Sequence, residues 1–399
     1  MGVNISYMGT KRELAGAVAD VISTCAQGPM LDVFSGMCSV GEAVGPVRPV
    51  WTNDAQVFAS EVGAALFTSQ TLPLRSQAIA DRFHTTYRIA LSRSQEMWSS
   101  QLAIEQALLE APNFDTFDLQ RASLLDALQT GARENGLQRP TLFASQYADS
   151  FFGLSQALEI DAIVEAVRGQ SPNLKMSESQ RWLMIALGRT MLRISTTTGH
   201  FAQYLNPKPN NFRTFQRQRR RRVWKEWLES NDELDPIGGA EWRRQNVAFN
   251  EDTLRLLPNL RNAAERPSVV YADPPYTNDQ YSRYYHLLET LILYDYPSIT
   301  GAGRYRDERF VTRFSLKSQS ASAISSLVAA VGQMGSDLVL SYPTNGLAYS
   351  KGINIEELLR CHFRSVEVCH AIAHDHSTFG ASKGPSKSSV IEKIYLGRS

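Results

Sequence analysis

The tetrapeptide Asp273-Pro274-Pro275-Tyr276 has the residue types and spacing of a chemical site. It follows an apolar, β-favouring run at residues 267–272, so a strand would deliver a carboxylate, two residues without N–H groups and an aromatic ring to one point. With average use of roughly 5% per residue type, a chance match in a chain of this length is on the order of one in a thousand. The alternative is a strand that Asp caps and two prolines stop. We interpret the tetrapeptide as an active site.

This combination suits the activation of an aromatic amino group. The lone pair of the exocyclic nitrogen of adenine or cytosine is delocalised into the ring until hydrogen bonds from both N–H groups localise it. Asp273 would accept one of these bonds and the carbonyl of Pro274 the other, because the fixed φ of proline holds that carbonyl in place. Tyr276 would stack on the face of the base.

The elements that must position this site follow an α/β order. An amphipathic helix is expected over residues 13–23, followed by a short buried strand at residues 30–34 and a small-residue turn, Ser35 to Gly41. A second strand, near residues 47–52, ends in Asn53-Asp54. In a doubly wound sheet the first turn lies at the carboxyl edge, where ligands bind, and an acid after the second strand can accept both ribose hydroxyls of a nucleoside cofactor.

A long, mainly helical excursion interrupts the expected sheet between about residues 61 and 244. We predict helices over residues 78–110, 119–134, 155–168 and 178–193. A basic run with interleaved aromatics spans residues 208–225 and would neutralise several phosphates, although a solvated helix face would look the same. The polar segment at residues 195–204 has hydroxyls, an imidazole and an amide that suit phosphates and base edges, although polar loops are common.

The chain returns to the sheet at residues 246–252, a β-favouring segment that ends in an acid. Beyond the tetrapeptide we expect a helix over residues 285–294, an arginine-rich loop, a helix over 321–334, a strand over 337–342 and a closing strand over 390–396. The histidines between His370 and Gly380 fit no usual zinc spacing, so we expect a polar loop beside the target base or on phosphate.

These segments resemble, in type and order, the DNA methyltransferases that use S-adenosylmethionine to methylate amino groups, and in particular the DNA adenine methylase group. The extended match runs from Asp273 to Leu291 and looks like modification methylases of restriction systems. The segment Tyr7-Met8-Gly9-Thr10-Lys11 resembles the N-terminal cofactor segment of the family, and residues 32–41 its main cofactor loop. Cys38 departs from the pattern, because the family commonly has glycine there, which implies a wider loop or a slightly displaced cofactor.

The resemblance implies a Rossmann-like methyltransferase core, doubly wound with a seven-stranded type of sheet, at residues 1–60 and 245–399, and an inserted helical target-recognition domain at 61–244. The cofactor is S-adenosylmethionine, its product S-adenosylhomocysteine, and no metal is expected. Aromatic rings at Tyr7 and Phe34 would attract the sulfonium cation. The implied cofactor-binding residues are Tyr7, Lys11, Asp32, Phe34, Gly36, Asp54 and Asp252, with Asn250 as an alternative to Asp252. The implied DNA-binding residues are Thr198, His200, Lys208, Arg213, Arg217, Arg219, Arg220 and Arg283.

Composition agrees with such an enzyme. The 399 residues are 43% apolar and 20% charged, with a net charge of +1, and they include no run of eighteen apolar residues and no signal-peptide pattern. Four scattered cysteines suggest reduced thiols in a cytoplasmic protein of the bacterial or archaeal cytosol and nucleoid.

The sequence thus predicts methylation of the 6-amino group of adenine in double-stranded DNA, with base flipping. A cognate restriction or defence-system protein is a further partner to consider, and no membrane is involved. Cytosine 4-amino methylation uses similar residues, RNA methylation is a weaker option, and a non-catalytic DNA-binding regulator with a vestigial pocket is the competing class.

Overall fold

The computed structural model describes residues 14–135, 140–169, 175–375 and 389–399, and in it the chain forms two compact units. The sheet unit comprises residues 2–70, 235–282 and 310–399, as far as they are described. The helical unit comprises residues 71–234 and 283–309. Tyr7 and Lys11, predicted to bind the cofactor, and residues 376–380 of the histidine-rich segment lie outside the described residues.

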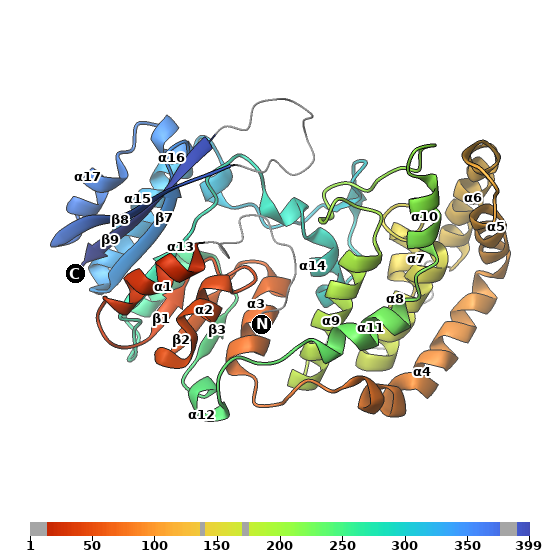
Figure 1. The fold of residues 1–399 in the computed structure, drawn as a ribbon, viewed down its shortest axis with the longest axis horizontal. Coiled ribbons are helices and arrows are strands. Elements are labelled where there is room, and N and C mark those ends of the chain that lie inside the picture. The colour runs from red at the N-terminus through yellow and green to blue at the C-terminus, as the bar shows by residue number, and fades with distance from the viewer. Residues whose placement is uncertain (1–13, 136–139, 170–174, 376–388) are drawn as a thin grey trace. The chain divides into compact units, whose positions relative to one another are not determined.

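A mostly parallel, seven-stranded sheet organises the sheet unit, in the order β3-β2-β1-β4-β7-β9-β8 (Figure 1). Only β9 runs antiparallel to its neighbours. This architecture is compatible with a Rossmann-like methyltransferase and confirms the predicted α/β core. The strands are β1 (Met30–Asp32), β2 (Val50–Asn53), β3 (Val247–Phe249), β4 (Val269–Ala272), β7 (Asp337–Pro343), β8 (Ser365–Asp375) and β9 (Ser389–Arg398).

The point of topological reversal lies between β1 and β4. From β1 the chain winds outward through β2 to β3, then crosses to β4 on the other side of β1. Leu31 pairs with Trp51 of β2 on one side and with Val270 of β4 on the other. Ligands of open α/β sheets bind outside the carboxyl ends of strands at such a point. The topology therefore directs attention to the residues that follow β1 and β4.

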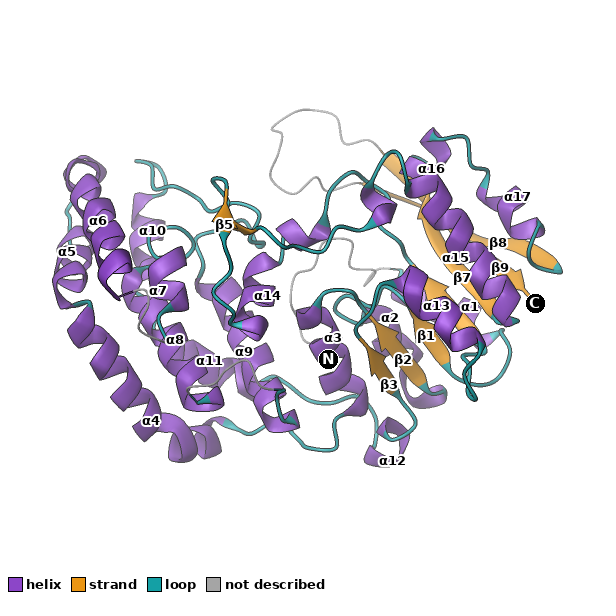
Figure 2. Cartoon of the chain, turned by 180° about the vertical axis from the view of Figure 1, so that it is seen from behind, coloured by secondary structure: helices purple, strands orange, loops and turns teal. Residues whose placement is uncertain are grey.

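Helices cover both faces of this sheet. Figure 1 shows α1 and α2 in front of it, and Figure 2, seen from behind, shows α13 and α15 in front of the strands. Side chains alternate along the strands, so Leu31, Val270 and Leu338 share a buried cluster with α13 and α15. The helices are α1 (Ala15–Ser23), α2 (Ser39–Val44), η1 (Gly45–Val47), α3 (Val57–Thr68), α12 (Ala240–Arg243), α13 (Thr253–Arg261), η3 (Arg313–Ser315), α15 (Ser320–Met334), α16 (Leu347–Ser350) and α17 (Ile355–Arg360); η2 (Tyr281–Arg283) spans the chain crossing between the units.

The helical unit packs around α8 and α9, whose apolar side chains are almost all buried. Ser177 caps α9, because its hydroxyl accepts the N–H of Gln180 while the Gln180 side chain accepts the N–H of Ser177. The elements are α4 (Ser76–Met97), α5 (Ser99–Leu109), α6 (Phe114–Asn135), α7 (Leu142–Tyr147), α8 (Leu154–Arg168), α9 (Glu178–Ile194), α10 (Phe212–Arg219), α11 (Val223–Asp232), α14 (His286–Leu293), β5 (Ile299–Thr300) and β6 (Tyr305–Arg306).

Two predicted elements differ in the structure. The helix expected over residues 78–110 is broken at Trp98, whose φ of −110° and ψ of 22° leave the helical region while its side chain becomes fully buried. The polar loop expected from His370 is wrong over residues 370–375, which belong to β8 and pair with β9. Edge strand β8 has little apolar alternation, so its pairing with β9 rather than its own pattern makes it a strand.

The segment after the tetrapeptide divides between the units. Residues 283–309, which the predicted domain boundaries place in the catalytic core, form part of the helical unit together with residues 71–234. Phe201 donates its N–H to the carbonyl of Tyr284 at 2.8 Å, and His286 Nε2 lies 3.0 Å from the carbonyl of Phe201. This segment thus packs with the polar loop of residues 195–204.

Candidate active site

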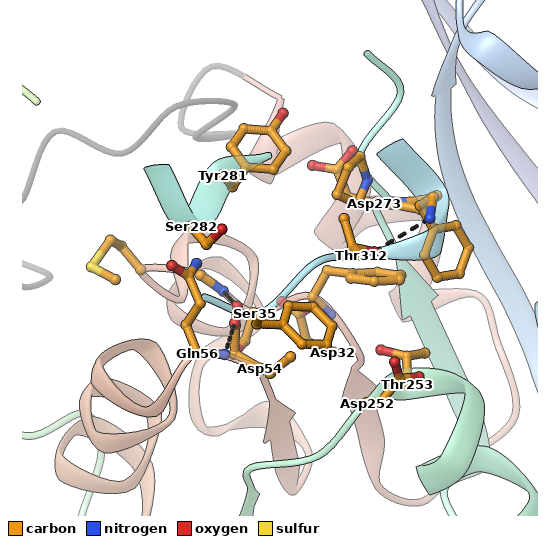
Figure 3. A pocket seen from close by; sticks show the side chains of 18 of the residues that line it. Asp32, Ser35, Asp54, Gln56, Asp252, Thr253, Asp273, Tyr281, Ser282 and Thr312 are labelled. Carbon is orange, nitrogen blue, oxygen red and sulfur yellow. Dashed lines mark hydrogen bonds between the residues drawn. The ribbon is translucent and has the colours of Figure 1, made fainter. Parts of the chain in front are cut away.

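One pocket in the sheet unit collects the segments that follow the four parallel strands β1 to β4 (Figure 3). It lies at the carboxyl edge that the point of reversal predicts. Its lining includes nine predicted site residues, so the described residues first chosen for cofactor binding and catalysis all meet there. These residues are Asp32, Phe34, Gly36, Asp54, Asp252, Asp273, Pro274, Pro275 and Tyr276.

The acid after β2 is held by backbone N–H groups. Asp54 Oδ2 accepts the N–H of Gly36 at 3.0 Å and Oδ1 accepts that of Gln56 at 2.9 Å. Burial raises the pKa of Asp54 to about 6, and the N–H bonds offset part of this effect. Each carboxylate oxygen has a second acceptor site, so Asp54 can still receive the two hydroxyls of a ribose.

A buried asparagine joins the ends of the first three strands. The Asn53 side chain donates to the carbonyls of Val33 (3.2 Å) and Glu251 (3.1 Å) and accepts the N–H of Glu251 at 3.1 Å. The backbone carbonyl of Asn53 accepts the N–H of Ser35 at 3.0 Å. The loops after β1, β2 and β3 are therefore held in one arrangement, and the sequence offered no sign of this role beyond the position of Asn53.

The loop after β1 combines a buried acid with left-handed backbone. Burial raises the pKa of Asp32 to about 8, and the nearby charges of Asp273 and Asp54 act in the same direction. Its carboxylate accepts the N–H of Phe34 at 3.2 Å. Gly36 has φ 48° and Cys38 has φ 65°, both in the left-handed region. The left-handed backbone at this position explains why glycine would suit it. In this chain a fully buried cysteine, Cys38, adopts that conformation instead.

The tetrapeptide opens directly off β4. Asp273 is half-buried and Tyr276 is buried, and both line the pocket. The carbonyl of Tyr276 accepts the N–H of Leu347 at 3.0 Å, which anchors the aromatic residue to the segment after β7. Among the described residues no hydrogen bond reaches the carbonyl of Pro274. That carbonyl keeps its acceptor capacity for a ligand, as the proposed activation of an amino group requires.

The far wall of the pocket is a segment that the sequence did not identify. The Gln280 side chain accepts the N–H of Thr312 at 2.9 Å and donates to its carbonyl at 3.4 Å. Phe314 meets the ring of Phe34 edge to face, with centroids 5.1 Å apart. Phe310, on the same segment, lines the pocket and is 37% exposed. An aromatic in a loop without periodicity has no sequence signal, so only packing reveals this wall.

Asp252 has two roles in the structure. It caps α13, since its Oδ1 accepts the N–H of Leu254 at 2.8 Å, and it also lines the pocket. Asn250, the other candidate, donates to the carbonyl of Asp54 at 2.8 Å and therefore supports the loop after β2.

In the helical unit, part of the predicted base-contacting loop, residues 195–204, is buried and bonded within the unit. His200 is buried, and its Nδ1 accepts the N–H of Ala202 at 3.2 Å. Burial lowers the pKa of His200. Thr198 is exposed, and its hydroxyl lies 3.4 Å from His200 Nε2. Of these two predicted contacts, only Thr198 presents its side chain to solvent.

The basic side chains of residues 208–225 differ in exposure, because some of them bond to neighbouring segments of the helical unit. Lys208, Arg213 and Arg217 are exposed. Arg219 is 4% exposed, stacks on Phe215 and donates to the carbonyl of Ser150 at 2.9 Å. Arg220, although exposed, donates to the carbonyl of Leu109. Arg219 therefore holds the interior of the helical unit, and we leave it out of the DNA-contacting set proposed below.

No group of three or more His, Cys, Asp or Glu side chains is placed to hold a metal ion within the described ranges. No described helix is long and apolar enough to cross a membrane.

Comparisons with known proteins agree with this geometry. Residues 175–330 match the family model for D12 class N6 adenine-specific DNA methyltransferase. Modification methylase StsI of Streptococcus sanguinis is 23% identical over 200 residues, 50% of this chain and 27% of that protein. Modification methylase LlaI of Lactococcus lactis subsp. lactis is 24% identical over 250 residues, 61% and 37% of the two chains. Type II methyltransferase M.FokI of Planomicrobium okeanokoites is 32% identical over 120 residues, 29% and 17%.

The matched family segment includes the tetrapeptide and the whole of residues 283–309. The chain spans between about one sixth and two fifths of the length of these relatives. The resemblance to the D12 class N6 adenine-specific DNA methyltransferases is thereby confirmed over residues 175–330, and methyltransferases of this family use S-adenosylmethionine.

Proposed function

We propose that this relative of the D12 class transfers a methyl group from S-adenosylmethionine to the 6-amino group of adenine in double-stranded DNA. The observation that carries the proposal is the single pocket in which the turn after β1, the acid after β2 and the tetrapeptide after β4 meet. A cofactor pocket and an amino-activating motif must share one cavity, because the methyl carbon and the accepting nitrogen have to come within contact distance.

The pocket residues offer the hydrogen-bond acceptors and the aromatic ring that S-adenosylmethionine would require. Asp54 provides acceptors for ribose hydroxyls, and Asp252 lines the cavity as an acceptor for its adenine amino group. Phe34 offers a ring to the sulfonium, and the carboxylate of Asp54, ionised above pH about 6, favours a cation nearby. When bound, S-adenosylmethionine supplies an electrophilic methyl group, and no metal takes part in this proposal.

The chain's own residues would orient and polarise the target base. Asp273 and the Pro274 carbonyl accept its two N–H groups, which localises the nitrogen lone pair and aims it at the methyl carbon. Tyr276, buried at the pocket and anchored through Leu347, holds the face of the ring. The base must leave the duplex to reach these groups, at a cost of about a few kcal/mol.

The helical unit is proposed as the target-recognition part. Thr198, Lys208, Arg213 and Arg217 are exposed polar or basic side chains on it, which suits contacts to phosphates and base edges. The relatives are named modification methylases, so we propose that this chain protects DNA in a restriction-modification or phage-defence system, with a cognate nuclease or defence protein as partner.

Nucleoside mass spectrometry tests the activity directly. Duplex DNA is incubated with the protein and methyl-labelled S-adenosylmethionine, digested to nucleosides and compared with RNA treated in the same way. Labelled N6-methyladenine from the duplex supports the proposal. Labelled N4-methylcytosine assigns the other amino base, label in RNA alone assigns another substrate, and no label in either supports a non-catalytic DNA-binding protein.

A further inference from the structure

The side-chain amide of Gln280 joins two segments that lie far apart along the chain. Its Oε1 accepts the N–H of Thr312 at 2.9 Å, and its Nε2 donates to the carbonyl of the same residue at 3.4 Å. The Ser315 hydroxyl adds a bond of 3.0 Å to the carbonyl of Asp279. We call these three hydrogen bonds the Gln280 staple. They hold residues 312–315 against the loop that begins with the tetrapeptide.

The staple lies where the chain leaves the sheet unit and returns to it. Ser282 is the last residue of this unit before residues 283–309 join the helical unit, and Phe310 is the first residue after them. Neither Gln280 nor Thr312 belongs to a strand. A primary amide can pair with both backbone groups of one residue, as a neighbouring strand would. Gln280 therefore supplies the pairing that these irregular segments lack.

The stapled segment in turn contacts the ring of Phe34. Thr312 caps η3, where its hydroxyl accepts the N–H of Phe314 at 3.4 Å. Phe314 is 3% exposed, and its ring meets that of Phe34 at 86° with centroids 5.1 Å apart. Phe34 is half-buried and lines the pocket. Because an edge-to-face pair restricts the tilt of both rings, the position of Phe314 limits the orientation that Phe34 presents to the pocket.

We infer that Gln280 is a positioning residue, which acts through Thr312 and Phe314 to orient the Phe34 ring toward the sulfonium of S-adenosylmethionine. The attraction between a cation and an aromatic ring requires the cation to lie over the ring face, so it depends on that orientation. Gln280 also belongs to the loop that begins at Asp273. One side chain thus links the acid proposed to activate the amino group with the ring proposed to face the methyl donor. The inference rests on the proposed function for the place of the cofactor.

The charge of the cofactor provides the test. S-adenosylmethionine carries a sulfonium cation, whereas S-adenosylhomocysteine has a neutral thioether sulfur in its place and the same adenosine and amino-acid parts. Calorimetry in the absence of DNA gives the affinity for each compound, and the ratio of the two affinities isolates the contact with the cation. A general loss of structure weakens the binding of both compounds and leaves this ratio unchanged.

Three variants compare the staple, the ring and an unrelated glutamine. Gln280→Met keeps the length of the side chain but leaves the N–H of buried Thr312 without its acceptor, so the affinity ratio should fall by about threefold. Phe34→Leu removes the ring and should lower the ratio by up to roughly tenfold. Gln333→Met changes an exposed glutamine on α15 that bonds to Arg261, and this matched control should keep the wild-type ratio.

A double variant tests whether Gln280 acts through Phe34. If it does, adding Gln280→Met to Phe34→Leu lowers the affinity ratio no further, because the ring that the staple orients is already gone. Independent losses that add in the double variant overturn the inference, and so does a wild-type ratio in Phe34→Leu. Circular dichroism establishes that each variant is folded. Should Gln280→Met fail to fold, Gln280→Asn, which withdraws the amide by one methylene, provides the same comparison.

The outcomes for the staple are distinct from those for the proposed function. If the wild-type protein methylates adenine and Gln280→Met has the same affinity ratio as Gln333→Met, the inference alone is overturned. If the wild-type protein binds S-adenosylmethionine but transfers no methyl group to DNA, the proposed function is overturned. A lowered ratio in Gln280→Met still supports the positioning role in that case.

Discussion

The two regions that the sequence marked most strongly behave in opposite ways in the folded protein. The residues predicted around the tetrapeptide converge on one pocket, although they come from four strands spread over more than two hundred positions. The basic run of residues 208–225 is contiguous, yet its charges separate into exposed, buried and hydrogen-bonded groups. A parallel sheet brings strand ends together, whereas nothing in a charge run determines which way each side chain faces.

The largest expected effect tests the converging region. Asp273→Ala removes the acceptor for one N–H of the target amino group, so methyl transfer should fall by about a thousandfold, the effect of losing one electrostatic contact to a reacting centre. Calorimetry should show S-adenosylmethionine affinity largely unchanged. Glu265→Ala, an exposed acid just before β4, is the control and should retain full activity. Activity that survives in Asp273→Ala would show that another group activates the base.

A pair of arginine variants tests the basic run of residues 208–225. Arg219→Ala removes a buried charge that bonds to Ser150 and lies near Asp149 and Glu105, so the free energy of unfolding should fall by about 3 kcal/mol. Arg217→Ala, two residues earlier and exposed, should change stability by less than about 0.5 kcal/mol while weakening DNA binding. Denaturant titration measures the first effect. Equal stability losses in the two variants would contradict the division of the run.

The pH dependence of cofactor binding examines one acid of the pocket. Burial raises the pKa of Asp54 to about 6, so in the folded protein the Asp54 carboxyl stays protonated below that pH. Ribose hydroxyls bind the ionised form of this carboxyl better. Cofactor affinity should therefore fall below pH 6, by up to about tenfold per unit. The same raised pKa makes the contribution of Asp54 to folding stability largest below pH 4, and this contribution is lost as pH rises to about 6.

Asp54→Asn provides the control for that profile. The variant cannot ionise, so its cofactor affinity, measured by calorimetry between pH 5 and 7, should be lower than that of the wild type near neutrality and flat. A wild-type profile that is equally flat in this window would remove Asp54 from the cofactor site.

The smallest effect concerns the departure from the family pattern. Cys38→Gly relieves a left-handed residue at a cost in unfolded-state entropy and in buried side-chain contacts, so stability should change by less than about 1 kcal/mol. Thermal unfolding and cofactor calorimetry check this prediction. A large gain in cofactor affinity would mean that Cys38 displaces the cofactor, as the sequence had suggested.

The spacing of apolar residues and the capping residues predicted most strands and helices correctly where the local sequence preference matches the folded structure. Strands β1 and β4 are short apolar runs with an acid at the last position or directly after it, and helices such as α9 have caps and periodicity that identify them. Edge strand β8 escaped prediction because its residues become a strand only through pairing with β9. Within the site, Gln280 and Phe310 escaped because their roles depend on a contact between two irregular segments.

The burial of Arg219 and the neutralisation of Arg222 show the same limit in the helical unit. Glu159, on the buried helix α8, accepts hydrogen bonds from Arg222 at 2.8 Å and from the N–H of Trp224 at 3.0 Å. A buried carboxylate must be paired, and the cation that pairs with it can come from a segment that is distant in the sequence. The sequence shows that both charges exist, but not that they meet.

By itself the sequence determined the type of sheet, the motif after β4, the acids after β1 and β2 and the family resemblance. These depend on short-range pattern and on strand ends that any parallel sheet must bring together. Tertiary structure alone decided which arginines of the basic run remain exposed and that Phe310 and Gln280 complete the pocket. Side-chain burial and pairing arise from contacts between distant segments, which no local spacing encodes.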